Sequence, residues 1–470
     1  MTRLWLGSLA ALVLFSSCTN DSGGGGEDTS VPVDTVAGDT TPLVVSALTA
    51  SPTPGNTLAA RVLWSTDAPA STALDLDCGE GWIHHLEADG LRTTHEVFLM
   101  GLWDGAGCTV EVTSVTADGV EGGGSVQFTA GPLPALLPPL DLQLHDAGNM
   151  QPGWTLFNLS NHYDKVPLLL AFVDEEGRYR WYHQRATASS GAATSVGVLD
   201  EGLLVGGTFD SGRIWPALID WEGAVLWERE IDMHHDLHPV DNGTWLWLGH
   251  AEACPNDIPN GGTVNRYDRD ADETPWSWSF CEHTLPDPIV KDWDHLNAVL
   301  PFPGEDALLI SAKNQYAVFK IDPGTGAVLW RLGKDGDFTR TDGDEHAFTN
   351  QHAPEFVADD GLLVFDNGVD GWRETSGAVQ VRFDEDAMTY EVVWSWYPDP
   401  PIYAPIWGDA DRLENGNTLV TFGRRDPELD SHIIEVTPAG ERVWQLVTPK
   451  KWGWYRAHRV PPLVPGFVKN

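Results

Sequence analysis

Short runs in which apolar and polar residues alternate make up much of the chain. In the N-terminal part, Leu58, Ala60, Val62 and Trp64 fall at every second position. This is the spacing of a strand that buries one of its two faces. Several such runs, separated by glycine-containing turns, lie between residues 43 and 132. Their number and spacing predict a β-sandwich.

One part of this region is similar to a known module. Residues 95–102 (HEVFLMGL), followed by a strand that begins at Cys108, resemble a fibronectin type III domain. We therefore expect residues 43–132 to form an immunoglobulin- or fibronectin III-like β-sandwich that acts as a spacer or docking module. Residues 133–143 are rich in proline and leucine, and we expect them to form a linker.

A longer pattern repeats from residue 144 to residue 470. Each copy ends in a strand that carries a tryptophan, in most copies after a glycine turn. The tryptophans are Trp181, Trp227, Trp278, Trp330, Trp396 and Trp444. Units of about 50 residues with several strands each are typical of a β-propeller, and the 3.6-residue period of a helical repeat is absent. We predict an all-β protein in which residues 144–470 form a six-bladed β-propeller.

The histidines follow the same repeat. His235, His295 and His352 each precede a strongly apolar strand, such as residues 308–310 or 362–365. We expect these apolar strands to be the innermost strands of their blades, which would place the three histidines at one mouth of the central channel. A propeller closes when its last blade pairs with its first, so we also expect residues 455–467 to pair with residues 145–157.

Three convergent histidines can bind a metal, exchange protons or act as a nucleophile. They can also be bonded only to backbone groups in a polar channel. His234 stands beside His235, and neighbouring side chains of a strand point to opposite faces, so we expect only one of the two to face the channel. We prefer His235, with His234 as the alternative. The same alternation makes the pair a poor ligand set for one ion, and we predict no metal centre.

Charge changes the range of functions to consider. The 470 residues include 69 acidic and 28 basic side chains, a formal net charge of −41. Nucleic-acid binding needs a basic face, so we exclude it. A site for an anionic substrate would need local cations of its own.

The N-terminus has the pattern of an export signal. Arg3 precedes an apolar run over residues 4–15, which is too short to span a bilayer, and Ser16 and Ser17 precede Cys18. The pattern resembles a bacterial lipoprotein signal over residues 1–18, with Cys18 as the lipidated residue. An ordinary secretory signal is the alternative. Acyl chains on Cys18 would anchor the protein to a membrane.

We therefore expect an exported protein, in the periplasm or at the cell surface, anchored by lipid to the outer membrane. Residues 19–42 contain four consecutive glycines and many Asp, Thr and Ser residues, which predicts a flexible linker.

Four cysteines remain after Cys18. They show no Cys-x-x-Cys spacing, so a zinc site is not expected. Exported proteins form disulfides, and proximity in the sequence predicts the pairs Cys78–Cys108 and Cys254–Cys281.

The motifs around the histidines carry a resemblance to a known family. They are His234-His235-Asp236, Asp294-His295-Leu296-Asn297, Ser311-Ala312-Lys313-Asn314, Gln351-His352-Ala353 and Phe365-Asp366-Asn367-Gly368. In order and approximate spacing they are similar to the bacterial arylsulfate sulfotransferases, from about residue 202 to residue 459. The resemblance implies a six-bladed propeller behind an N-terminal β-sandwich.

The resemblance also implies an activity and roles for residues. Family members move a sulfuryl group from an aryl sulfate to a phenolic acceptor by a ping-pong mechanism through a sulfohistidine, without a cofactor. The nucleophile would be His352, while His235 and His295 would bind sulfate oxygens and move protons. Lys313 stands where the family has an arginine. We also assign Asn297 and Asn367 to substrate binding, with turn formation as the alternative, and a homodimer is a further expectation.

Two other functions compete with this one. Lysine lacks the planar fork of arginine, so the change at Lys313 favours a non-catalytic, surface-anchored binding propeller that kept the fold. A metal-dependent hydrolase is the other alternative, and its activity would be lost with a chelator.

Overall fold

The computed structural model describes residues 42–161, 166, 169–185, 191–209, 216–231, 233–241, 243–251, 254, 261–283, 292–343, 345–357, 361–369, 371, 373–423, 426–463 and 465–469. In these residues the only helices are two single turns of 3-10 helix, η2 (Phe280–Glu282) and η3 (Lys313–Gln315). All other regular structure is strand, and the sheets are almost wholly antiparallel. The predicted all-β class is confirmed.

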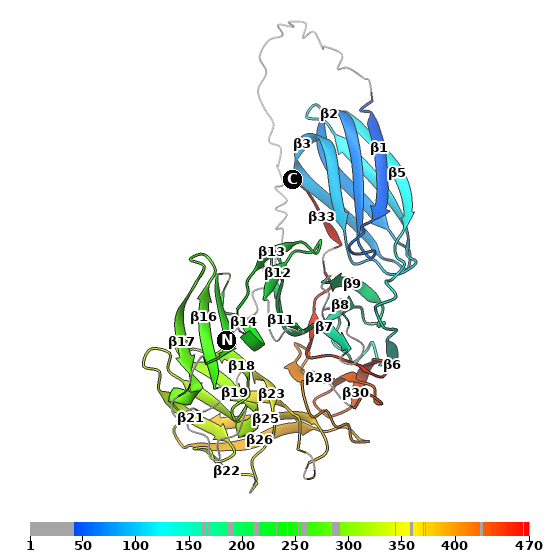
Figure 1. Ribbon diagram of the computed structural model, residues 1–470. Helices are drawn as coiled ribbons and strands as arrows, with labels where there is room; N and C mark the ends of the chain where they lie inside the picture. Colours follow the sequence, from blue (N-terminus) through cyan, green and yellow to red (C-terminus); the bar gives the residue numbers. More distant parts are fainter. Residues whose placement is uncertain are drawn as a thin grey trace, which may run out of the picture.

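The first sheet, here called the N-terminal sheet, holds six strands in one hydrogen-bonded network. It consists of β1 (Val45–Pro52), β2 (Ala60–Asp77), β3 (Ile83–Leu99), β4 (Gly107–Val115), β5 (Glu121–Thr129) and β33 (Gly466–Val468). The long strand β2 connects them, because its first part pairs with β1 and its last part with β4. Alternate residues of β2 are buried, as the period-two pattern predicts. Figure 1 shows this sheet at one end of the molecule.

Six further sheets follow in the described part of the chain, and we number them 1 to 6 in chain order. Sheet 1 contains β7 (Trp154–Asn161), β8 (Leu169–Val173) and β9 (Tyr179–Gln184), joined by the C-terminal strands β31 (Trp452–Gly453) and β32 (Ala457–Val460). Sheet 2 contains β10 (Gly191–Leu199), β11 (Gly202–Phe209), β12 (Ala217–Ile219) and β13 (Val225–Glu228). Sheet 3 contains β14 (Met233–Pro239), β15 (Thr244–His250), β16 (Gly262–Asp268) and β17 (Glu273–Ser279).

Sheet 4 contains β18 (Leu296–Pro301), β19 (Leu308–Ala312), β20 (Ala317–Ile321) and β21 (Val328–Gly333). Sheet 5 contains β22 (Thr339–Arg340), β23 (His352–Val357), β24 (Gly361–Asp366), β25 (Gly377–Asp384) and β26 (Thr389–Trp396). Sheet 6 contains β27 (Asp409–Arg412), β28 (Thr418–Phe422), β29 (His432–Val436), β30 (Arg442–Val447) and β6 (Asp141–His145).

Each repeated tryptophan lies in a different one of these sheets, in β9, β13, β17, β21, β26 and β30. Four of the indole N–H groups donate to a backbone carbonyl in a turn of the next sheet. The donors and acceptors are Trp181 and Trp221 (3.0 Å), Trp278 and Gly326 (2.8 Å), Trp396 and Gly440 (3.1 Å), and Trp444 and Glu175 (2.7 Å). The last bond joins sheet 6 to sheet 1. The repeat therefore marks the contact between successive sheets, which needs a large apolar side chain with one N–H donor.

The strands next to the histidines differ from the expectation. In sheets 3, 4 and 5, the edge strands that follow the histidines or contain them are β14, β18 and β23. We call them the first strands of these sheets. Strand β14 contacts β18, and β18 contacts β23. The apolar runs at residues 308–310 and 362–365 lie in β19 and β24, the second strands of sheets 4 and 5. A second strand has neighbours on both edges and sheets on both faces, so it reads as a continuous apolar run. The strands β14, β18 and β23 are more polar, and the apolar pattern did not reveal them.

The chain ends close the structure in two places. Residues Ala457–Val460 of β32 pair with Phe157–Trp154 of β7, which confirms the expected pairing of the tail with the start of the repeat. The tail then departs from that expectation, because β33 pairs with β3 of the N-terminal sheet. Residues 141–143, at the end of the predicted linker, belong to β6 and pair with β30.

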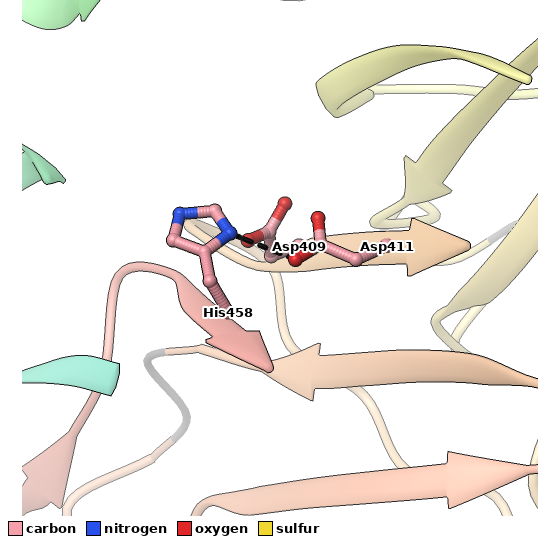
Figure 2. A group of neighbouring side chains, drawn as sticks. All are labelled: Asp409, Asp411 and His458. Atoms are coloured by element: carbon pink, nitrogen blue, oxygen red, sulfur yellow. Dashed lines mark hydrogen bonds and ion pairs between the residues drawn. The ribbon is translucent and has the colours of Figure 1, made fainter. Parts of the chain in front are cut away.

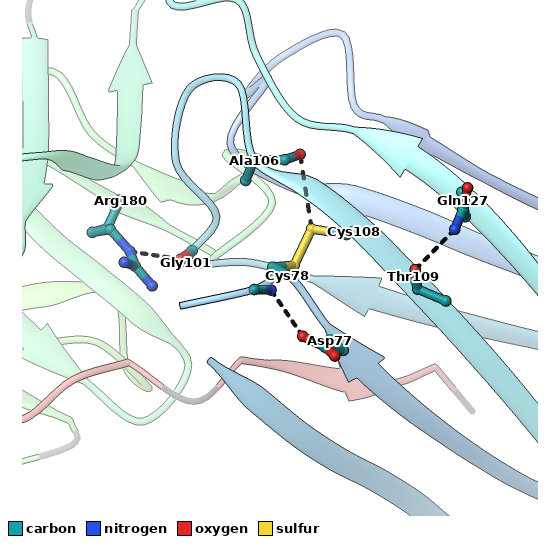
Figure 3. Close-up of a disulfide and its surroundings, with 9 residues drawn as sticks. Asp77, Cys78, Gly101, Ala106, Cys108, Thr109, Gln127 and Arg180 are labelled. Carbon is teal, nitrogen blue, oxygen red and sulfur yellow. Dashed lines mark hydrogen bonds between the residues drawn. A yellow bond between two sulfur atoms is a disulfide. The ribbon is translucent and has the colours of Figure 1, made fainter. Parts of the chain in front are cut away.

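Both predicted disulfides, Cys78–Cys108 and Cys254–Cys281, are present. Figure 3 shows the first of them beside the contact between the N-terminal sheet and sheet 1, where Arg180 Nε donates to Gly101 O at 2.7 Å. Cys18 and the predicted signal and lipidation site lie outside the described residues. Among the residues that the structure describes, no helix is long and apolar enough to span a membrane.

Candidate active site

The three histidines lie at matching bulges where the first strands of sheets 3, 4 and 5 begin. The strand register shifts between Met233 and Leu237, between Leu296 and Ala298, and between His352 and Glu355. Left-handed backbone occurs at each bulge or beside it, at His235 (φ 59°), His295 (φ 45°) and Ala353 (φ 46°). Bulges re-aim side chains and are common beside active sites. They also remove the simple alternation of side chains on which the sequence argument relied.

His352 is held in one tautomer by Asn367. The amide nitrogen of Asn367 donates to Ala404 O and Trp407 O, both at 2.7 Å. Its two hydrogens are therefore used, and its oxygen faces His352 Nδ1 at 2.7 Å. An amide oxygen only accepts hydrogen bonds, so Nδ1 of His352 carries the hydrogen and donates. The lone pair on Nε2 of His352 is left available.

Burial keeps His352 neutral. Its side chain is almost fully buried, and burial, together with the charge of Lys313, lowers its pKa to about 3. A neutral imidazole with a free Nε2 lone pair is the form that attacks an electrophile.

A second chain of hydrogen bonds sets the tautomer of His235. His234 Nε2 lies 3.0 Å from Gly249 O, so it donates its hydrogen there and leaves Nδ1 as an acceptor. His235 Nδ1 lies 2.9 Å from that acceptor and donates to it. Burial and the neighbouring histidines lower the pKa of His234 to about 3 and that of His235 well below its usual range. His234 thus orients His235, whose Nε2 is free.

His295 has an acidic partner. Its Nδ1 donates to Asp292 Oδ2 at 2.6 Å, so its Nε2 is also directed away from the supporting residue. Burial alone would raise the pKa of Asp292, but the hydrogen bond from His295 and the charges of His295 and Lys313 outweigh burial and lower it. The carboxylate of Asp292 therefore fixes the orientation of the His295 ring.

Tyr455 brings the histidines into one group. The ring centroids of His235 and His295 are 4.6 Å apart, and the ring of Tyr455 lies 6.2 Å from His235 and 6.1 Å from His352. The Tyr455 hydroxyl is buried without a hydrogen-bond partner. Trp407, from the segment before β27, packs against the same ring at 5.7 Å. The sequence around Tyr455, in the tail at residues 455–467, contains no local motif that marks a site.

Lys313 supplies the positive charge. It begins the 3-10 turn η3, and its backbone N–H donates to His295 O at 3.1 Å, which fixes it beside that histidine. Its charge helps to lower the pKa of His352 and His235. Burial lowers the pKa of Lys313 itself, and Asp292 opposes that shift. Nζ donates to the neighbouring Asn314 at 3.3 Å. Lys313 is thus part of the site and not an isolated surface lysine.

The two predicted asparagines support the site from behind. Asn297 and Asn367 have no exposed surface. Asn297 Nδ2 donates to Gln351 O at 2.7 Å, which holds the backbone that leads into His352. Gln351 is itself fixed by its Nε2, which donates to Ser311 Oγ and Ala317 O. Contact of these asparagines with a substrate stays a prediction, whereas their hydrogen bonds to His352 and to its backbone hold His352 in position.

A family model now supports the resemblance on which the roles rest. Residues 274–455, somewhat less than half of the chain, match the family model described as Arylsulfotransferase (ASST). The match includes His295, Lys313 and His352 but not His235. The family resemblance expected from the motifs is confirmed over this range. No curated protein matches the chain.

Three solved structures with some similarity to the chain are distant in sequence. They include Pseudomonas aeruginosa periplasmic gluconolactonase (12% identity, 84% of this chain and 98% of that chain, TM-score 0.32). Another is a luciferin-regenerating enzyme (11% identity, 69% of this chain and 99% of that chain, TM-score 0.34). A third is Kuenenia stuttgartiensis hydrazine synthase (13% identity, 52% of this chain and 62% of that chain, TM-score 0.31). We base no conclusion on similarities at this level.

Proposed function

From the arylsulfotransferase match over residues 274–455, we propose that the protein moves a sulfuryl group from an aryl sulfate to a phenolic acceptor through a sulfohistidine at His352. One observation carries the proposal. The buried imidazole of His352 gives its Nδ1 hydrogen to Asn367, which leaves the Nε2 lone pair free beside His235, His295 and Lys313.

In the first half-reaction, His352 Nε2 attacks the sulfur of the aryl sulfate. The bond between sulfur and the aryl oxygen breaks, and its electron pair leaves with that oxygen. Protonated His295, supported by Asp292, gives its proton to the departing phenolate. The products are a free phenol, a sulfuryl group on His352 Nε2 and a neutral His295.

In the second half-reaction, neutral His295 takes the proton of the acceptor phenol. The phenol oxygen attacks sulfur, the nitrogen–sulfur bond breaks, and its electron pair returns to His352 Nε2. The protons balance over the two halves, because His295 regains the proton that it gave away. No cofactor takes part in either half.

Charge stabilisation comes from two groups. Sulfuryl transfer spreads negative charge over three sulfate oxygens, and fixed cations or donors that meet this charge lower the barrier. The ammonium of Lys313 and the unpartnered hydroxyl of Tyr455 provide one charge and one donor. The ring of His235 contacts the ring of His295 and helps to orient it. In a protein of net charge −41, such a local cation is what an anionic substrate requires.

We also infer that sheets 1 to 6 are the blades of a six-bladed propeller formed by residues 144–470. The tryptophan bonds from sheet to sheet, including Trp444 to Glu175, support it. We further propose that residues 43–132 form an immunoglobulin- or fibronectin III-like module. Export and anchoring through Cys18 to the outer membrane also stay proposals, and the two disulfides fit an oxidising compartment. A homodimer stays a prediction.

The decisive experiment follows phenol release from an aryl sulfate with and without an added phenol acceptor. The wild type is compared with His352→Ala and with His85→Ala as the matched control. The Nδ1 atom of His85 lies 2.7 Å from a carboxylate oxygen of Asp75, and His85 is exposed on the N-terminal sheet. We expect acceptor-dependent release in the wild type and in His85→Ala, and its loss in His352→Ala. Mass spectrometry of a rapidly quenched reaction should find the sulfuryl group on the peptide with His352.

Two other outcomes would overturn the proposal. Release that survives His352→Ala and stops with a chelator would identify a metal-dependent hydrolase. No release from any of several aryl sulfates, by a folded protein, would favour a binding propeller in which lysine at position 313 does not support transfer.

A further inference from the structure

A second group of ionisable side chains lies where the two ends of the repeat meet. Asp409 and Asp411 are on β27, and His458 is on β32. His458 Nδ1 lies 2.7 Å from Asp411 Oδ2 and 3.7 Å from Asp409 Oδ2. Figure 2 shows the imidazole of His458 reaching toward both carboxylates. The cluster therefore joins β27 of sheet 6 to β32 of sheet 1.

The three side chains place possible ligand atoms close to one another. One oxygen of each carboxylate and one nitrogen of His458 all lie within 4.8 Å of one another. Ligand bonds of about 2.0–2.3 Å place the ligand atoms around a common ion at separations of about 3–4.5 Å. Small side-chain movements would bring the three atoms to that separation.

Asp409 has an unused oxygen directed into the cluster. The residue is 2% exposed, and its Oδ2 has no hydrogen-bond partner. Its other oxygen accepts from the backbone N–H of Ala410 at 3.1 Å. A buried carboxylate oxygen without a partner is costly unless a proton or a cation satisfies it.

The surrounding charges are mostly negative. Glu355, from β23, acts electrostatically on Asp409 and is held by the N–H of Arg412 at 2.8 Å. Arg456 is the nearby cation, but its guanidinium is bonded to Asp236 at 2.9 Å. Both Asp236 and Asp409 act on this guanidinium.

We propose that Asp409, Asp411 and His458 bind one divalent transition-metal cation, such as Mn²⁺ or Zn²⁺, which ties β32 to β27. A set of two carboxylates and one imidazole suits such ions better than Ca²⁺, which takes oxygen ligands almost only. Because β32 comes from the end of the chain and pairs with β7, the ion would stabilise the contact between sheet 1 and sheet 6.

The test is a titration of the metal-stripped full chain with Mn²⁺, followed by the electron paramagnetic resonance signal of the free ion. We expect one tight site per chain, weakened at least tenfold in Asp409→Asn and in His458→Gln. His85→Gln, at an exposed histidine–aspartate pair, should bind Mn²⁺ as the wild type does. Zn²⁺ should compete with Mn²⁺ for the site, and Ca²⁺ should not compete at similar concentrations.

A second readout covers the case in which a variant does not fold. Pulsed resonance of Mn²⁺ bound to the wild type should show coupling to one imidazole nitrogen, and binding should raise the melting temperature. Loss of binding in His352→Ala, or unchanged binding in both Asp409→Asn and His458→Gln, would place the ion elsewhere and refute the proposal. Absence of a tight Mn²⁺ or Zn²⁺ site in the wild type, or a preference for Ca²⁺, would refute it as well.

Discussion

Asn367 accepts the Nδ1 hydrogen of His352 at 2.7 Å, and two backbone carbonyls prevent its amide from turning round. The proposed nucleophile therefore has one tautomer and one orientation before any substrate binds. This preorganisation is the basis of the first prediction below.

Replacing Asn367 with leucine should impair catalysis more than folding. The variant keeps the volume but removes the hydrogen bond to His352 and the two hydrogen bonds to backbone carbonyls, for a loss of about 1–3 kcal/mol in the free energy of unfolding. We expect kcat to fall by roughly 10²-fold, since the wrong tautomer presents an N–H to the sulfur. Steady-state kinetics and urea unfolding measure the two effects. Asn415→Ala, in an exposed turn, is the control, and an unchanged kcat in Asn367→Leu would contradict the tautomer argument.

Asp292→Asn should affect donors with poor leaving groups most. Asp292 accepts the Nδ1 hydrogen of His295, and in the proposed mechanism His295 gives a proton to the departing phenolate. Without the carboxylate, the leaving group must depart with less help. We expect the dependence of log kcat/KM on the pKa of the released phenol to become steeper. A series of substituted phenyl sulfates measures that slope, and a parallel decrease for all donors would show that Asp292 has only a structural role.

Lys313→Met should lower kcat/KM by roughly 10²–10³-fold, because it removes the one positive charge that we assign to the sulfate oxygens. Lys313→Arg should retain activity or raise it, because guanidinium can bind two oxygens at once. Lys450→Met, at an exposed ion pair with Glu428, serves as the control. Equal activity of Lys313→Met and the wild type would exclude Lys313 from the reaction.

Stability should fall as the solution is acidified below the ordinary pKa of histidine. His352 is neutral in the folded protein down to pH of about 3, whereas in the unfolded chain it binds a proton near pH 6.5. Between these values the unfolded state binds more protons, so the free energy of unfolding rises with pH and decreases on acidification. His352→Gln should remove about one proton from this dependence, or about 1.4 kcal/mol per pH unit.

Urea unfolding between pH 7 and pH 4.5 measures that slope. His85 is a useful contrast, because its hydrogen bond to Asp75 raises its pKa. A raised pKa gives stability at low pH that is lost as the pH rises, so His85→Gln should not reduce the slope. A slope that is the same in His352→Gln and in the wild type would show that His352 is charged in the folded protein.

Trp444→Phe should destabilise the closure between sheet 6 and sheet 1. It deletes the N–H that donates to Glu175 O at 2.7 Å and leaves that carbonyl without its partner, for a loss of about 1–2 kcal/mol beyond the lost packing. Trp330→Phe is the matched control, because the indole nitrogen of Trp330 is buried without a hydrogen-bond partner. Thermal unfolding of both variants isolates the hydrogen bond, and equal losses in both would mean that it contributes nothing.

Local patterns in the sequence were enough for the all-β class, the tryptophan repeat, the two disulfides and the family resemblance. Each depends on spacing within about 50 residues, where strand alternation and turn residues act directly. Only the tertiary structure decided which strands are innermost, because a polar first strand of four to seven residues leaves little trace in hydropathy. It also decided the tautomers of His235 and His352, since bulges redirect these side chains toward partners such as Asn367.

The cluster of Asp409, Asp411 and His458 is likewise decided only by the tertiary structure. Nearly fifty residues separate His458 from the two aspartates, and no motif links them. They meet because β32 returns to pair with β7 while β27 opens sheet 6. The same return brings Tyr455 between His235 and His352. Long-range pairing of chain ends is a property of the closed fold, whereas strand periodicity is a property of each segment.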